Sequence, residues 1–516
     1  ASPFALQDCQ ALWGDVLQQH PETWKWLSDS PLLLAALAEA IPLSGKKEEA
    51  LRVLGAIRLK HPTASQELPG LVAAFAVFWS DYLDRPFPRL RLHYNQKAKQ
   101  PDVPVTPELV AGFLGYYLLH EKELKFPLRQ APWSILLFLV DSDLPVEERE
   151  WALARYKDKY RATALFDELP SDQNLFQGKK KAIVTHPFTL QNLLRYGGLC
   201  LEHSYYTSEV LKALGHPAVI LQAYGRLGLP HAWVGFLERS DDKWLWDCSV
   251  GRYRNKDYYK GFLLHPTPLP LSSDHELAFL AWGLSRTEAV LQDEASRRRA
   301  LLGAPGSPLP SPEKTFRGLR ALFRDDPLSF PLLTDLLRLI SETSLPLALL
   351  REVRDQDVPL LAEYSLDLSG RLLLACWQKG ALNADERAPA YARRALAPFS
   401  GRPDLDLKLR LDFCALLPED QAAVARELLE EAVRGLAPRA PFLAYVALGA
   451  ARPRWPAAEW KKLGPELARL ILASVEPPEE GYGVLRKESL HARLNDYLTR
   501  QESAMELPVP LSEIIR

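Results

Sequence analysis

Three residues in the middle of the chain have the types and the order of a thiol acyl-transfer site. Cys200 follows Gly197 and Gly198, His231 follows a turn, and Asp247 comes later in an apolar run. A cysteine sulfur can attack a carbonyl carbon, an imidazole can take the thiol proton, and a carboxylate can orient the imidazole. Taken singly, the cysteine also fits a buried structural role and the histidine an inert core position. Their order along the chain favours the catalytic interpretation.

These side chains need a helix followed by an antiparallel sheet. Residues 200–214 suit a helix, and Gly215 is placed to end it in a left-handed conformation. Three short runs rich in strand-forming residues follow, separated by turn residues: 218–224, 231–238 and 243–249. A helix followed by such a meander predicts an α+β arrangement.

The expected helix begins at Cys200, and this position matters for its chemistry. The positive end of a helix dipole and its unpaired N–H groups stabilise a thiolate and can donate to an oxyanion. Asp247 interrupts an apolar strand, and a buried carboxylate is costly without a partner. The expected partner is the ring of His231 on the neighbouring strand.

Residues 191–249 resemble the signature of the transglutaminase-like superfamily. The resemblance rests on four stretches: Gly198-Leu199-Cys200, Leu214-Gly215-His216-Pro217-Ala218, His231-Ala232-Trp233-Val234 and Trp246-Asp247. It implies a papain-like core with Cys200, His231 and Asp247 as the catalytic triad. The chain departs from the family at three positions, where the family favours Ile, Arg and Pro: His216, Val219 and Cys248. The stretches Gly251-Arg252-Tyr253 and Tyr258-Tyr259-Lys260-Gly261 resemble a bacterial subgroup for which the resemblance implies no substrate.

Further site residues are expected around the triad. Papain-like enzymes use a side chain shortly before the nucleophile as a second oxyanion donor, and Gln191 is the preferred candidate over Asn192 and Tyr196. Tyr196 and Trp233 are candidates for lining the substrate site, although core packing explains a tryptophan equally well. His203, one turn along the helix from Cys200, is badly placed to act as the base.

Helical patterns dominate the rest of the chain. We expect an N-terminal helical region over 1–130, the catalytic core over 131–302, a Gly-, Pro- and Ser-rich linker over 303–312 and a C-terminal helical domain over 313–516. Capping residues followed by proline mark three helix starts: Ser30-Pro31, Thr106-Pro107 and Ser311-Pro312. The C-terminal domain fits either a helix-pair solenoid or an irregular bundle.

Composition limits the classes of function. With 63 basic and 65 acidic residues and no block of like charge, nothing indicates a nucleic-acid partner or an anionic membrane. No apolar run reaches the roughly 18 residues of a membrane span. The five cysteines include no CxxC pair, which argues against a disulfide scaffold and a structural zinc site, and no calcium loop or other cofactor motif is visible. Cys376 and Cys414 suit core positions, and a disulfide between them is left open.

The sequence thus predicts an enzyme that forms a Cys200 thioester with a carboxamide or peptide and transfers the acyl group to an amine or water. A cysteine protease or amidase shares every residue named. A non-catalytic helical interaction protein with a vestigial core is the third alternative. A protein or peptide is the expected partner, and the oligomeric state is not defined. The start Ala-Ser-Pro without methionine fits a secreted or periplasmic mature protein, and equally a trimmed cytoplasmic one.

Overall fold

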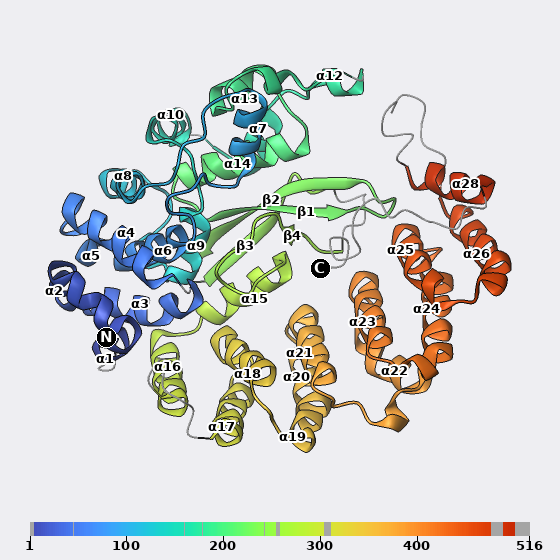
Figure 1. Ribbon diagram of the computed structural model, residues 1–516. Helices are drawn as coiled ribbons and strands as arrows, with labels where there is room; N and C mark the ends of the chain where they lie inside the picture. The colour runs from blue at the N-terminus through green and yellow to red at the C-terminus, as the bar shows by residue number, and fades with distance from the viewer. Residues whose placement is uncertain are drawn as a thin grey trace.

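Helices surround a small antiparallel sheet in this α+β protein (Figure 1). The computed structural model describes residues 5–44, 46–158, 160–177, 179–241, 243–253, 259–303, 311–475 and 489–500. The sheet has the order β3-β2-β1-β4. Its strands are β1 (Ala218–Tyr224), β2 (Pro230–Ser240), β3 (Lys243–Val250) and β4 (Phe262–Leu263). The three strands predicted from sequence are confirmed, and β4 is an additional short edge strand.

Before the sheet, the chain forms a series of helices that lie to one side of it (Figure 1). They are α1 (Ala5–Trp13), α2 (Pro21–Ser28), α3 (Pro31–Ser44), α4 (Lys47–Lys60), α5 (Ala64–Glu67), α6 (Pro69–Ser80), α7 (Leu90–Lys97), α8 (Pro107–His120), α9 (Trp133–Val140), α10 (Val146–Tyr156), α11 (Ala162–Glu168), α12 (Gln173–Phe176), α13 (Leu190–Tyr196) and α14 (Cys200–Ala213). The starts predicted at Pro31 and Pro107 are confirmed. At the second, the Thr106 hydroxyl accepts a hydrogen bond from the Leu109 N–H at 3.2 Å.

Helix α14 carries Cys200 and packs against β1 and β2. It ends where the sequence predicts, because Gly215 adopts a left-handed conformation with φ of 93°. Most of its side chains are buried, from Glu202 to Ala213. Helix α9 is almost completely apolar, and it is buried between α6 and β1. The sheet and its helix therefore lie deep in the molecule.

After the sheet, α15 (Asp274–Leu284) packs on β3, and the remaining helices follow one another in an arc (Figure 1). They are α16 (Glu288–Leu302), α17 (Pro312–Asp325), α18 (Phe330–Glu342), α19 (Leu347–Glu352), α20 (Val358–Ala362), α21 (Leu366–Gln378), α22 (Pro389–Leu396), α23 (Pro403–Ala415), α24 (Ala422–Leu436), α25 (Pro441–Ala451), α26 (Ala457–Leu472) and α28 (Leu490–Arg500). From α16 on, each long helix packs mainly on its neighbours in sequence, which is the packing of a solenoid. The third predicted start, at Pro312, is confirmed.

Short 3-10 helices and one π-helical turn link these elements. They are Gly14–Gln19, Ala182–Thr185, Val353–Asp357 (the π-turn between α19 and α20), Ala384–Glu386, Ala397–Phe399, Glu419–Gln421 and Arg452–Arg454. Of the predicted linker, residues 304–310 lie outside the described residues.

The arc of C-terminal helices returns to the sheet at the β1–β2 hairpin (Figure 1). The Phe442 N–H donates to the Arg226 carbonyl, and the Arg226 guanidinium donates to the Pro438 carbonyl, both at 3.2 Å. Beside them, Lys260 Nζ lies 2.9 Å from Asp367 Oδ1 in a buried ion pair. The arc is thus attached to the sheet layer twice, at its start through α15 and at the start of α25 through this hairpin.

Two further properties follow from the described residues. None of the helices in the described ranges is long and apolar enough to cross a bilayer. The thiols of Cys376 and Cys414 are free and buried in α21 and α23, as expected for core cysteines.

Candidate active site

Cys200 is the first residue of α14 and is half-buried. Burial raises the pKa of its thiol above the usual value, and backbone hydrogen bonds from Ala232 and Leu201 oppose that rise. Ala232 is the third residue of β2 and directly follows His231. The sulfur therefore lies against the beginning of β2, where the sequence places the base.

The two glycines before Cys200 have an internal function. Gly197 adopts φ of 73°, and a Cβ there would collide with the Pro170 carbonyl oxygen. A Cβ on Gly198 would collide with the side chain of Glu202. The Gly198 carbonyl also accepts a hydrogen bond from the Asp172 N–H at 2.9 Å. The glycines thus allow the chain to pass close to its own loop and helix.

His231 is buried and only 6% exposed. Its Nε2 lies 2.7 Å from the carbonyl oxygen of Gly251. Burial lowers the pKa of the His231 ring below its ordinary value, while the bond to the Gly251 carbonyl opposes the fall. The ring stacks on Tyr253, with centroids 4.4 Å apart, and more distantly on Trp233. The imidazole is thus held in a defined orientation by the Gly251 carbonyl and the Tyr253 ring.

A buried carboxylate lies two residues after the cysteine. Burial would raise the pKa of Glu202, but Lys181 and Tyr94 lower it below the usual value. Lys181 Nζ lies 2.8 Å from Glu202 Oε1, and the Tyr94 hydroxyl donates to the same oxygen at 2.5 Å. The other carboxylate oxygen accepts from the Leu199 N–H at 2.8 Å. Glu202 therefore caps the N-terminus of α14 by accepting from the N–H of the residue before the helix. Its negative charge also contributes to the raised pKa of Cys200.

Asp247 lies away from His231 along the hairpin. In the β2–β3 ladder Asp247 is paired with Phe236, whereas His231 is near the other end of β2. Asp247 Oδ1 accepts a hydrogen bond from the Ser249 N–H at 2.8 Å. The structure therefore places the Cys200 sulfur against the backbone of Ala232, the residue after His231, and does not bring the Asp247 carboxylate to the His231 ring.

The secondary candidates have other surroundings. Gln191 is exposed on α13. Tyr196 stacks face to face on His186, with centroids 3.8 Å apart. Trp233 is completely buried, which leaves no surface for a substrate and makes it a support for the His231 ring. His203 Nδ1 is within 2.7 Å of the Phe166 carbonyl, in agreement with its exclusion as the base.

Sequence reasoning missed Gly251, Tyr253 and Glu202 as parts of this site. Gly251 and Tyr253 belong to a stretch that was noted only as a subgroup feature, and nothing in their types indicates a contact with His231. Glu202 carries a usable signal, since a glutamate at the third helical position often bonds the N–H before the helix.

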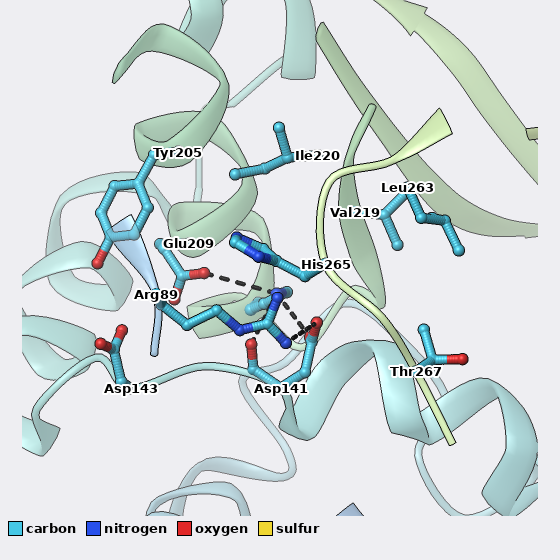
Figure 2. Close-up of a pocket in the computed structure, with 11 residues that line it drawn as sticks. Arg89, Asp141, Asp143, Tyr205, Glu209, Val219, Ile220, Leu263, His265 and Thr267 are labelled. Atoms are coloured by element: carbon cyan, nitrogen blue, oxygen red, sulfur yellow. Dashed lines mark hydrogen bonds and ion pairs between the residues drawn. The ribbon is translucent and has the colours of Figure 1, made fainter. Parts of the chain in front are cut away.

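A second polar group lies farther along α14, around a small cavity (Figure 2). Lys212 Nζ is 2.6 Å from Asp141 Oδ1 and 3.5 Å from Glu209 Oε1. Arg89 Nη2 is 3.4 Å from Asp141 Oδ2, and His265 projects toward the same group from the loop after β4 (Figure 2). The charged side chains in this cluster are paired with one another, so we assign the cluster a structural role in stabilising the fold.

Within the described ranges, no group of three or more His, Cys, Asp and Glu side chains is arranged to hold a metal ion. Because comparisons with known proteins give no match, the site is interpreted from its own geometry. No protein-family model, no curated protein and no solved structure matches this chain.

Proposed function

We propose that the chain is a thiol acyltransferase of the transglutaminase-like type. One observation carries the proposal: the Cys200 sulfur, at the first residue of α14, lies against the backbone of Ala232, the residue that directly follows the buried His231. This arrangement combines a nucleophile, a nearby candidate base and the N–H groups at the start of a helix. The resemblance of residues 191–249 to the transglutaminase-like signature supports the same conclusion.

The reaction begins with an uncharged pair. Burial raises the pKa of Cys200 and lowers that of His231, so the thiol and the neutral imidazole both persist near neutral pH. His231 takes the thiol proton as the sulfur attacks the carbonyl carbon of an amide. The N–H groups at the start of α14 are the candidate donors to the resulting oxyanion.

The second half returns the enzyme to its resting state. The carbon–nitrogen bond breaks, His231 gives its proton to the leaving amine, and a thioester remains on Cys200. An amine or a water molecule then attacks the thioester and loses its proton to His231, and the departing sulfur takes that proton back to restore the thiol and the neutral imidazole. The substrate that we propose is a glutamine side chain or a peptide bond in a protein or peptide. A protease or amidase would use the same steps with water as the final acceptor.

A second candidate is a non-catalytic interaction protein, and Glu202 favours it. A buried carboxylate close to the cysteine disfavours the thiolate, and burial acts in the same direction. The long helical arc would then be the functional part. The two candidates differ in what happens when Cys200 is removed.

The test uses the full chain with a glutamine-containing peptide and a fluorescent primary amine. Amine incorporation, ammonia release and peptide cleavage are measured for the wild type, Cys200→Ala and Cys248→Ala. Cys248 is a matched control, because it is also a half-buried thiol but lies on β3. We expect product from the wild type and Cys248→Ala, and none from Cys200→Ala. Equal yields from the wild type and Cys200→Ala, including no product from either, would reject the proposal.

A further inference from the structure

We propose that the backbone carbonyl of Gly251, rather than the carboxylate of Asp247, orients the catalytic histidine. The inference rests on the proposed function, since it assigns a positioning group to the same site. It replaces a charged side chain with an uncharged main-chain acceptor. Three features of the described residues support it: a hydrogen bond, a strand register and the conformation of one glycine.

The hydrogen bond determines which ring nitrogen of His231 carries the proton. The Gly251 carbonyl oxygen can only accept, and it lies 2.7 Å from Nε2. Nε2 must therefore be protonated and donate. In the neutral ring this leaves Nδ1 as the basic nitrogen that takes the thiol proton. An orienting group in a catalytic triad has the same task.

The strand register explains why Asp247 does not fill this role. Pairs along the β2–β3 hairpin run from Ser240–Lys243 through Phe236–Asp247 to Val234–Val250, with an irregularity between the last two. Residues opposite the start of β2 must therefore come after Val250, and Gly251 is the first of them. The Asp247 carboxylate instead caps a local turn through the Ser249 N–H.

Gly251 is suited to this position by its missing side chain. Its φ is 79°, a conformation that residues with a Cβ rarely adopt. A Cβ there would also collide with the ring of Phe166 on α11. The same Phe166 accepts through its carbonyl from His203 on α14, at 2.7 Å. Helix α11 thus braces both the carbonyl-bearing loop and the helix of the nucleophile.

The chemical consequence is a less stabilised imidazolium. A neutral carbonyl compensates a positive ring less than a carboxylate does, because it carries no net charge. The direction of the His231 pKa, below the ordinary value, agrees with this expectation. We therefore expect the ring to remain neutral in the resting enzyme and to be charged only during turnover.

The experiment measures the state of His231 in the full chain without any substrate. Two-dimensional NMR of protein labelled with ¹⁵N-histidine reports the tautomer and pKa of each ring, and His231→Gln identifies the signal. We expect the Nε2-protonated tautomer in the wild type and an unchanged tautomer and pKa in Asp247→Asn. An Nδ1-protonated ring, or a lower His231 pKa in Asp247→Asn, would overturn the assignment to Gly251.

Turnover gives the second readout. We expect Asp247→Asn to change kcat/KM by less than about twofold, because the geometry of the ring does not depend on it. If Asp247 were the orienting group, the loss would be on the order of 10⁴ in kcat, which would contradict the proposal. Gly251→Ala should lower kcat/KM, and Gly251→Ala combined with Phe166→Ala should recover part of the loss by removing the collision. Since the NMR readout needs no substrate, a failure of the proposed function would show in the turnover assay alone.

Discussion

The two ends of helix α14 use polar groups in opposite ways. At its N-terminal end, Cys200 and His231 are both kept uncharged by burial and are held by backbone groups. Toward its C-terminal end, Glu209 and Lys212 are buried and form ion pairs with each other and with Asp141; Figure 2 shows Glu209 and Asp141 in this cluster. The N-terminal end thus holds two neutral groups that can exchange a proton, whereas the C-terminal end holds charged side chains that are paired with one another.

This difference has a physical basis. A buried ion that loses its partner is destabilised by several kcal/mol, so a charged cluster resists change. A thiol and an imidazole can be buried neutral at much lower cost, and their proton can move between them. The comparison teaches that the reactive end of the helix is the one with fewer charges. Four substitutions or pH changes test it.

The largest effect is expected from Cys200→Ala. Removal of the nucleophile should reduce acyl transfer by a factor on the order of 10⁴ or more. The free energy of unfolding should change by less than about 1 kcal/mol, because the side chain is small and half-buried. Steady-state assays and urea unfolding measure the two quantities. If Cys200→Ala instead lowered the free energy of unfolding so far that the loss of activity followed from loss of folded protein, Cys200 would be a structural residue.

The next largest effect is expected from Lys212→Met at the other end of the helix. This change leaves Asp141 and Glu209 without their shared cation, so the free energy of unfolding should fall by about 3–5 kcal/mol. Arg52→Met is the matched control, since it breaks an ion pair with Asp84 whose side chains are 42% and 61% exposed. The control should cost less than about 1 kcal/mol in urea unfolding. Equal costs would show that burial of the cluster contributes nothing.

A smaller effect is expected at the turn that ends α14, where His216 is buried without an acidic partner among its hydrogen bonds. Burial lowers its pKa from 6.5 to about 4, while the bond to the Leu237 carbonyl opposes the fall. Between these values the unfolded chain binds a proton that the folded chain does not, so stability falls as the pH decreases from 6.5 to 4. The loss should reach roughly 3 kcal/mol. In urea unfolding across this range, His216→Gln should show a shallower pH dependence than the wild type, and an identical slope would contradict the account.

The smallest effect is expected from Glu202→Gln. The amide keeps an oxygen that can accept from the Leu199 N–H, while the negative charge near the thiol disappears and Lys181 remains. The pKa of Cys200 should fall, and alkylation by iodoacetamide at neutral pH should become several-fold faster because more thiolate is present. Glu209→Gln is the control, because Glu209 is a buried glutamate on the same helix but lies two turns farther from Cys200. Equal alkylation rates in the two variants would show that Glu202 does not act on the thiol.

The sequence predicted the helix and strands around the site well, but it did not predict how strands β2 and β3 pair with each other. Periodicity and turn residues located α14, β1, β2 and β3, and Gly215 marked the end of the helix. The pairing of β2 with β3 depends on the irregularity between Val234 and Phe236, which no composition pattern reveals. Asp247 was therefore a reasonable partner for His231 in sequence but not in the sheet. Side-chain type could not identify Gly251 either, because its contribution is a backbone carbonyl.

The most direct test of the account is acylation of the protein by p-nitrophenyl acetate, which needs no knowledge of the natural substrate. Peptide mapping by mass spectrometry locates the acetyl group, and release of p-nitrophenol gives its rate. We predict a hydroxylamine-labile acetyl group on Cys200 that forms much more slowly in His231→Gln, while Cys248 remains unmodified. Acetylation spread over other residues with Cys200 unmodified, or an unchanged rate in His231→Gln, would contradict a thiol site at the start of α14.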